Sequence, residues 1–219
     1  MNNDVCPFCK EEQDRKANLI KKSRVIAETN DFIIFPTVGG FVENYQLIVP
    51  RKHINCFGQL KVNEWDELKE IIMWQKKINE QYFNSGTLMF EHGALFSNNE
   101  SGKSIVHAHL HIFPSNTSLM ECMVEYNLFI QRIMDISQLS EFCHKYESYL
   151  YYGDFDNKDY VITHQGLPSQ FLRKVLADSL GISTWNWREF PYIENIENCI
   201  KFYRTSPHIY DYLNSEEKI

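Results

Sequence analysis

The chain lacks several features that would assign it to large classes of protein. No apolar run approaches the roughly 20 residues that cross a bilayer, and Met1–Asp4 is polar rather than the basic and then apolar start of a secretion signal. Positive charge is scarce, because 22 Lys and Arg stand against 29 Asp and Glu, a net charge of −7. Proteins that bind nucleic-acid polymers need a positive surface to displace counterions. We therefore expect neither a membrane nor a nucleic-acid polymer as partner.

The chain also lacks the cysteine pattern of a disulfide framework, internal repeats and low-complexity segments. Only Cys6 and Cys9 lie close together, which is typical of reduced thiols in a cytoplasmic protein. With 219 residues, of which 43% are hydrophobic, the chain can bury a full core. The four remaining cysteines are scattered: Cys56, Cys122, Cys143 and Cys199.

The most informative stretch is His107–Pro114, in which three histidines alternate with apolar residues. On an extended strand the three imidazoles project from one face, and the apolar side chains between them face the other. Histidine titrates near neutral pH, binds zinc and acts as a nucleophile. Since three of the eight histidines fall within five positions, the pattern favours a chemical site. The alternatives are a solvent-facing strand that happens to be rich in histidine and a chance metal cluster.

This stretch resembles the His-φ-His-φ-His-φ-φ motif of the histidine-triad (HIT) superfamily, in which φ is apolar. The segment before it (99–106) and an upstream segment (47–54) resemble the same family. The resemblance covers about residues 5–116. It implies an α+β fold, a five-stranded antiparallel sheet with a long helix packed on it, a small nucleotide substrate and a homodimer.

Local patterns agree with that fold and indicate an extension after Pro114. Asn63 is the expected N-cap of the long helix. The apolar stripe of this helix should lie across the sheet. The five expected strands are 24–29, 32–35, 45–49, 87–91 and 105–113. We expect helices at 118–134, 139–147, 167–180 and 193–203, and a hairpin of 149–152 with 159–163. The predicted units are a HIT-like core (1–116) and a mixed, mostly helical extension packed on it (117–219).

The resemblance also implies roles for individual residues. His109, the middle histidine, would attack the α-phosphorus of a nucleotide conjugate and form a nucleotidyl-histidine. His111 would donate to the phosphoryl oxygens or the leaving group. Asn99, Lys103 and Ser104 in the preceding loop would contact the substrate.

Two departures from the family pattern leave recognition of the substrate open. Pro36 stands where many relatives carry an Asp for the ribose hydroxyls, and Ser115 follows Pro114 where many have Arg. His92 is a candidate additional donor, although a histidine at a strand end is as often satisfied by backbone. Further phosphate donors can come from the extension: His164, Gln170 and Arg173. The basic pair Arg51 and Lys52 is better interpreted as solvated than as a phosphate site.

Cys6 and Cys9 form a Cys-x-x-Cys motif, which brings two thiolates onto one tetrahedral zinc. In relatives that carry such a zinc, positions like His53 and His107 supply the other two ligands. We therefore expect a structural zinc that clamps the N-terminal segment onto the sheet. A redox dithiol and two buried free cysteines are the alternatives.

These observations favour an enzyme that cleaves a nucleoside phosphate conjugate of the dinucleoside polyphosphate, phosphoramidate or nucleotide-sugar type. It is either a hydrolase or a nucleotidyltransferase, since both share the first half-reaction. One alternative is a nucleotide-binding or scaffold protein that no longer turns over substrate. Another is a zinc-dependent hydrolase with the three histidines on one catalytic metal.

Overall fold

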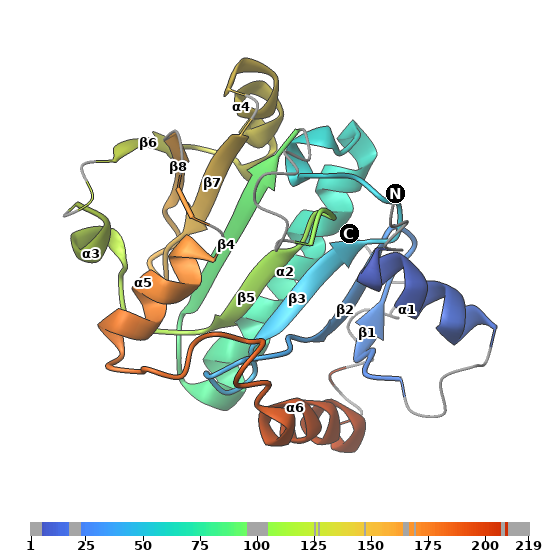
Figure 1. Cartoon of the computed structure of the whole chain (residues 1–219). Coiled ribbons are helices and arrows are strands. Elements are labelled where there is room, and N and C mark those ends of the chain that lie inside the picture. The colour runs from blue at the N-terminus through green and yellow to red at the C-terminus, as the bar shows by residue number, and fades with distance from the viewer. Residues whose placement is uncertain are drawn as a thin grey trace.

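The computed structural model describes residues 6–17, 23–95, 105–124, 126, 128–146, 148–163, 167–168, 170–206 and 209. At its centre is an eight-stranded sheet with the strand order β1-β2-β3-β5-β4-β7-β8-β6, and all neighbouring pairs are antiparallel (Figure 1). The strands are β1 (Ala27–Glu28), β2 (Phe32–Pro36), β3 (Gln46–Pro50), β4 (Thr87–Ala94), β5 (Leu110–Pro114), β6 (Phe129–Ile133), β7 (Ser148–Gly153) and β8 (Asp159–Thr163).

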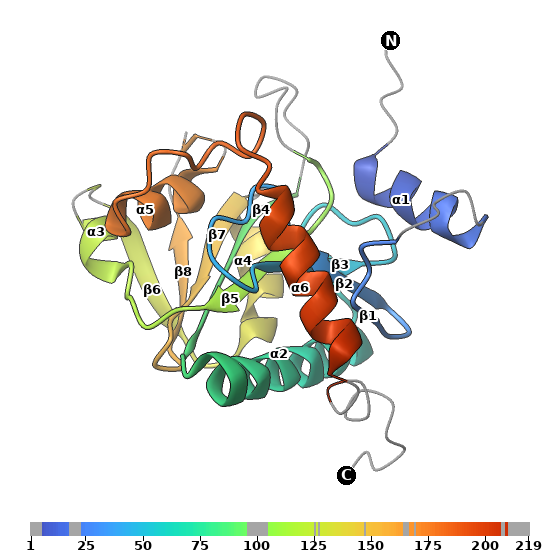
Figure 2. The same cartoon turned by 90° about the horizontal axis from the view of Figure 1, so that it is seen from below.

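Helices lie on both faces of this sheet. They are α1 (Pro7–Lys16), α2 (Val62–Phe83), α3 (Met120–Val124), α4 (Leu139–Tyr146), α5 (Phe171–Ser179) and α6 (Ile193–Thr205), with the short 3₁₀ helices η1 (Phe57–Gln59) and η3 (Ile136–Gln138). The view along the sheet edge separates α2 on one face from α1, α3 and α5 on the other (Figure 2). No helix in the described part of the chain combines the length and apolar character needed to cross a bilayer.

The α+β class is confirmed, but the sheet is larger than the five strands expected. β7 pairs with the outer edge of β4, from Met89 opposite Gly153 to Ala94 opposite Ser148. The predicted hairpin of 149–152 with 159–163 is confirmed as β7 and β8. Strands from both sides of residue 116 therefore belong to one sheet, while the division into two units there stays a prediction.

The expected helix over 118–134 is wrong. Its apolar spacing fits a helix, but only α3 is helical, and Phe129–Ile133 forms the edge strand β6 against β8. The isoleucines of this strand favour extended backbone. Its pairing partner β8 lies about thirty residues further along the chain. Pairing with β8 therefore overrides the local helical pattern.

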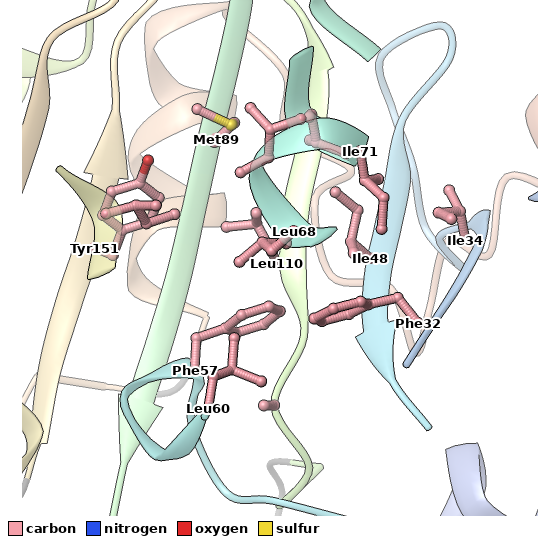
Figure 3. Packing of buried hydrophobic residues seen from close by; sticks show 14 of the residues in the cluster. Phe32, Ile34, Ile48, Phe57, Leu60, Leu68, Ile71, Met89, Leu110 and Tyr151 are labelled. Atoms are coloured by element: carbon pink, nitrogen blue, oxygen red, sulfur yellow. The ribbon is translucent and has the colours of Figure 1, made fainter. Parts of the chain in front are cut away.

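The face that carries α2 holds the larger core. Leu68 and Ile71 of α2 point at Ile48 and Leu110 of the sheet, and η1 closes the end of this cluster with Phe57 (Figure 3). Each such side chain contributes about 1.5–3 kcal/mol when fully buried. The sheet and α2 therefore form a rigid platform for the opposite face.

The long helix begins two residues earlier than expected. α2 starts at Val62, and Lys61 rather than Asn63 is the N-cap. The Glu64 carboxylate accepts a hydrogen bond from the Lys61 backbone N–H at 2.6 Å, which closes the first turn. Asn84 ends the helix in a left-handed conformation with φ of 47°, which asparagine adopts more readily than most residues.

The opposite face is covered by α3 and α5 of the extension and by α1. Side chains of α5 such as Phe171 and Leu172 pack on Phe90 and Phe113 of the sheet, while Phe8 of α1 packs over β2 and β3. This is the face to which the histidines of residues 107–111 belong.

Candidate active site and metal centre

The three histidines project from one face, as the alternating pattern predicted. Ala108, Leu110 and Ile112 are buried in the core beneath α2, so the residues between them face the other way. Regular strand geometry begins only at Leu110. The first two histidines therefore lie in the segment that leads into β5.

The His109 ring is held by one backbone contact. Its Nδ1 lies 2.7 Å from the carbonyl oxygen of His107. Because a carbonyl oxygen only accepts hydrogen bonds, Nδ1 carries the proton and Nε2 keeps its lone pair. Burial, and then the positive charge of Arg173, lower the pKa of His109 although the carbonyl opposes this. His109 is thus neutral at neutral pH, with one ring nitrogen available to attack.

His111 lies on β5 between two aromatic rings. It stacks on Phe90 with ring centres 4.6 Å apart, and its edge faces Tyr45 at 5.6 Å. Burial lowers the pKa of His111 well below its usual range, and the neighbouring His109 ring and the Arg173 charge oppose its protonation further. Its Nδ1 is buried without a hydrogen-bond partner.

The extension brings a cation to this face. Arg173 on α5 is 3% exposed, and its Nη2 donates to the carbonyl oxygens of Gly39 and Trp185 at 2.6 and 2.9 Å. Its guanidinium carbon lies 5.5 Å from the centre of the Tyr45 ring. The expectation that Arg173 belongs to the neighbourhood of the histidines fits this position, and its role as a substrate ligand stays a prediction.

The loop that receives Arg173 depends on a glycine. Gly39 has φ of +77°, and a Cβ there would lie 2.3 Å from the Cβ of Trp187. Its N–H donates to the carbonyl oxygen of Pro191 at 2.8 Å. A side chain at position 39 would therefore push the extension away from the sheet.

Two further predicted residues fall on the same side. On β4, Phe90 pairs with His111 and therefore faces the same side of the sheet. His92 lies two positions after Phe90, so it shares this face with His111 and His109. Gln170 precedes α5 in a left-handed conformation, and its side-chain oxygen is buried without a partner. Their contact with substrate stays a prediction. Asn99, Lys103, Ser104 and His164 lie outside the described residues.

Sequence reasoning missed Tyr45, which lies between His111 and Arg173. Side chains alternate between the two faces of the sheet along residues 45–49, so Tyr45 shares a face with Leu47 and Val49. This alternation could have placed Tyr45 on the histidine side. Its hydroxyl is buried without a hydrogen-bond partner.

A second cluster lies at the N-terminus of α1. Cys6, Cys9, His53 and His107 bring four candidate ligand atoms within 4.8 Å of one another. The Cys6 and Cys9 sulfurs lie 3.3 and 3.6 Å from His107 Nδ1, and Cys9 lies 3.3 Å from His53 Nδ1. Zinc–sulfur and zinc–nitrogen bonds at a tetrahedral angle place such atoms about 3.6 Å apart. The donor set therefore fits a tetrahedral metal.

The surroundings of His107 support this fit. Its Nε2 lies 2.8 Å from the carbonyl oxygen of Pro50, so Nε2 carries the proton and Nδ1 faces the sulfurs with its lone pair. The pKa of His107 is lowered to about 4, chiefly by burial, which keeps the ring neutral as a ligand must be. Within the described part of the chain, neither His109 nor His111 belongs to this group. That arrangement disfavours a catalytic metal held by all three histidines.

Ion pairs fix α1 over the sheet. Arg51 contacts the carboxylates of Glu12 and Glu28, and Arg24 binds Glu11 at 2.6 Å. The interpretation of Arg51 as merely solvated is therefore wrong, because its charge is used to hold α1. Phe8 of the same helix lies 5.6 Å from the rings of both His107 and His109, so it packs between the two clusters.

The chain is similar to one family model and to several solved structures. The HIT domain family model matches residues 18–118. A hypothetical histidine triad nucleotide-binding protein from Sulfolobus tokodaii is 14% identical, with 98% of this chain and 99% of that chain covered and a TM-score of 0.47. A HIT family hydrolase from Legionella pneumophila is 23% identical over 52% of this chain and 95% of that chain, with a TM-score of 0.38. A HIT family hydrolase from Clostridium thermocellum is 20% identical over 51% of this chain and 91% of that chain, with a TM-score of 0.36. No curated protein matches the chain.

Proposed function

Residues 18–118 match the HIT domain family model, and on that premise we propose that the chain is an enzyme that cleaves a nucleoside phosphate conjugate through His109. The reaction is hydrolysis or nucleotidyl transfer on a dinucleoside polyphosphate, a phosphoramidate or a nucleotide-sugar. The observation that carries the proposal is the hydrogen bond from His109 Nδ1 to the His107 carbonyl oxygen. It leaves Nε2 unprotonated and fixes the direction of its lone pair.

The reaction proceeds in two steps. The Nε2 lone pair of His109 attacks the α-phosphorus, a P–N bond forms, and the bond to the leaving group breaks with its electron pair. His111 donates a hydrogen bond where negative charge accumulates, on a phosphoryl oxygen or on the leaving group. Water or another acceptor then attacks phosphorus and gives up a proton to solvent, and the P–N bond breaks with its electron pair returning to Nε2, which restores the neutral ring.

We propose that the remaining predicted residues bind the substrate around His109. The loop residues would donate to phosphoryl oxygens, and His92 would add a donor from β4. Arg173 gives the pocket a local positive charge in a chain whose net charge is negative. The proposed substrate-binding residues are Asn99, Lys103, Ser104, His92, Gln170 and Arg173.

We propose zinc as the metal of the Cys/His cluster, bound by Cys6, Cys9, His53 and His107. With all four positions occupied by protein ligands the ion has no open position for substrate, so its function is structural. It would hold α1 against the segment that carries His107, and His107 in turn orients His109. All six cysteines are free thiols, which fits a reducing compartment, and we propose a cytoplasmic location.

Turnover assays with a replacement of the nucleophile test the proposed activity. The purified chain is incubated with one representative of each conjugate class, and released nucleotide is measured by chromatography. Wild type should turn over at least one class, and His109→Ala should lower kcat by at least about a thousandfold, since it removes the attacking atom. Mass spectrometry of quenched wild type should show one added nucleotidyl group.

The matched control is His144→Ala, because His144 is an exposed histidine on α4, which packs on the other face of the sheet. This variant should keep wild-type kcat. Equal activity of His109→Ala and wild type would rule out the proposed nucleophile. Binding of a nucleoside monophosphate with no turnover of any class would instead support the non-catalytic alternative, which the absence of a side-chain acceptor at Pro36 favours.

A further inference from the structure

Three buried polar atoms on the histidine face have no hydrogen-bond partner. They are the Tyr45 hydroxyl, His111 Nδ1 and Arg173 Nε, on side chains that are 3%, 9% and 3% exposed. A buried polar group without a partner has lost its hydrogen bonds to water and gained none in return. Three such groups in one place are costly for a fold that, like most, is only marginally stable.

The three groups are neighbours although they come from different parts of the chain. Tyr45 and His111 have ring centres 5.6 Å apart, and the Arg173 guanidinium carbon lies 5.5 Å from the Tyr45 ring centre. The first two residues belong to the HIT domain, and Arg173 comes from the extension on α5. The cluster therefore exists only when the extension is docked.

The Arg173 charge has no anionic partner in the described part of the chain. The ion pairs found there do not include it, and its Nη2 is occupied by two backbone carbonyls. Buried charges in proteins are normally paired, because an isolated charge in an apolar setting is expensive. The two carbonyls fix the orientation of the guanidinium, and its Nε–H has no hydrogen-bond partner.

All three unpartnered atoms can act as donors. The phenol O–H and the guanidinium Nε–H are donors by their chemistry, and His111 Nδ1 is a donor in one of its two neutral tautomers. A buried cation with a set of donors around it matches an oxyanion. A neutral ligand would leave the positive charge unpaired.

We propose that Tyr45, His111 and Arg173 form a buried binding site for a phosphoryl group, so that the extension completes the substrate site of the HIT domain. The identification of this anion as part of the substrate rests on the proposed function; the anion site itself does not. Arg173 would thereby select for substrates whose phosphoryl group reaches beneath α5.

Calorimetric titration with inorganic phosphate tests the site. Wild type, Tyr45→Phe and Arg173→Gln are titrated at constant ionic strength, with acetate as a second probe. We expect phosphate to bind wild type, with acetate at least about tenfold weaker because a carboxylate offers fewer acceptors. Tyr45→Phe should weaken phosphate binding about tenfold, and Arg173→Gln should weaken it at least about thirtyfold.

The Tyr45→Phe variant also separates binding from folding. Because its hydroxyl makes no well-aligned hydrogen bond in the protein and interacts only with the neighbouring Arg173 guanidinium, its removal should change the midpoint of thermal unfolding without phosphate little. The matched control is Tyr152→Phe, whose hydroxyl donates to Asp154 and accepts from the N–H of Leu119, both at 2.8 Å. That variant should lose stability and keep wild-type affinity for phosphate.

The proposal is overturned if phosphate does not bind wild type, if acetate binds equally well, or if Tyr45→Phe binds phosphate as tightly as wild type. If Arg173→Gln does not fold, the Tyr45→Phe result alone decides. Phosphate binding that depends on Tyr45, without turnover of any conjugate, upholds this site and contradicts the proposed activity. Turnover that depends on His109 and is unchanged in Tyr45→Phe upholds the activity and contradicts this site.

Discussion

His107 holds the ring of His109 through a single backbone oxygen, 2.7 Å from Nδ1. The imidazole of the same residue faces the sulfurs of Cys6 and Cys9. One residue thus links the metal centre to the proposed nucleophile, and a change at the metal centre should be detectable at His109.

The first prediction concerns metal content. We expect about one zinc per chain in wild type and none in Cys9→Ser, because three remaining ligands bind a tetrahedral ion far more weakly. Without the metal α1 is held only by its ion pairs and by Phe8, so the midpoint of thermal unfolding should fall by about 10 °C. Mass spectrometry of the metal and calorimetry measure the two quantities. Cys122→Ser, a partly buried cysteine outside the cluster, should change neither.

The outcome for Cys9→Ser separates a structural metal from a catalytic one. If the zinc is structural, Cys9→Ser should lose both the metal and stability. Its activity should then fall only to the extent that His109 loses its orientation. Loss of activity at unchanged stability would contradict the structural assignment. Wild type purified with full stability and no metal would exclude the zinc site.

The second prediction concerns pH. Burial raises the pKa of Glu91 to about 8, although the N–H of Phe57 and the hydroxyl of Tyr149 donate to its carboxylate. The unfolded chain titrates this group near 4.5, so between about pH 4.5 and 8 the folded state binds more protons than the unfolded one. Stability contributed by Glu91 is therefore fully present below pH 4.5 and is lost as pH rises toward 8, by a few kcal/mol.

Urea unfolding of wild type and Glu91→Gln from pH 5 to 8 tests this dependence. Glutamine stays neutral and keeps an acceptor oxygen, so the decline with pH should be much smaller in the variant. The same slope in both proteins would assign the pH dependence to other groups.

The third prediction concerns the junction between α6 and the sheet. The Tyr203 hydroxyl accepts hydrogen bonds from the side-chain amides of Gln46 at 2.7 Å and Gln75 at 2.9 Å, and all three residues are buried. Tyr203→Phe leaves both amides with one partner fewer and should lower the free energy of unfolding by about 1–3 kcal/mol. Tyr82→Phe is the control, because Tyr82 contacts the same helix through Phe202 but is 43% exposed. A loss of equal size in both variants would argue against the buried network.

The fourth prediction concerns assembly. The family resemblance implies a homodimer formed by joining sheets, and the outer edge of β4 is already paired with β7. We expect the dimer interface at β6, the last strand of the described sheet. Phe129 on this strand is 64% exposed, and Met134, which follows it, is 84% exposed. Light scattering after size exclusion should give a dimer for wild type and a monomer for a Phe129→Lys, Met134→Lys double variant. A monomeric wild type would contradict this prediction.

The periodic parts of the fold were predictable from sequence, and the non-local parts were not. The alternation of His107 to Ile112 and the apolar stripe of α2 each repeat with the period of their element, so the local pattern is sufficient. The pairing of β7 with β4 joins segments about sixty residues apart, and no local pattern specifies it.

The site divides in the same way. The sequence alone indicated which histidines share a face and that Cys6 and Cys9 can hold a metal, and the family resemblance added His53 and His107 as the other two ligands. It placed Arg173 near phosphate only as one option, and it gave no sign that Tyr45 lies between Arg173 and His111. Those contacts depend on how α5 docks, which is determined by packing of the extension rather than by any residue's neighbours in the chain.

The cover that α5 provides over the histidine face has a consequence for synthesis. A ribosome completes the histidine strand well before it reaches Arg173 or Tyr203. At that stage Tyr45, Phe90 and Phe113 have no cover on their face, and β4 has no partner on its outer edge. The emerging chain therefore passes through a stage with an exposed apolar surface and an unpaired strand edge, which lasts until β7 and α5 have been synthesised.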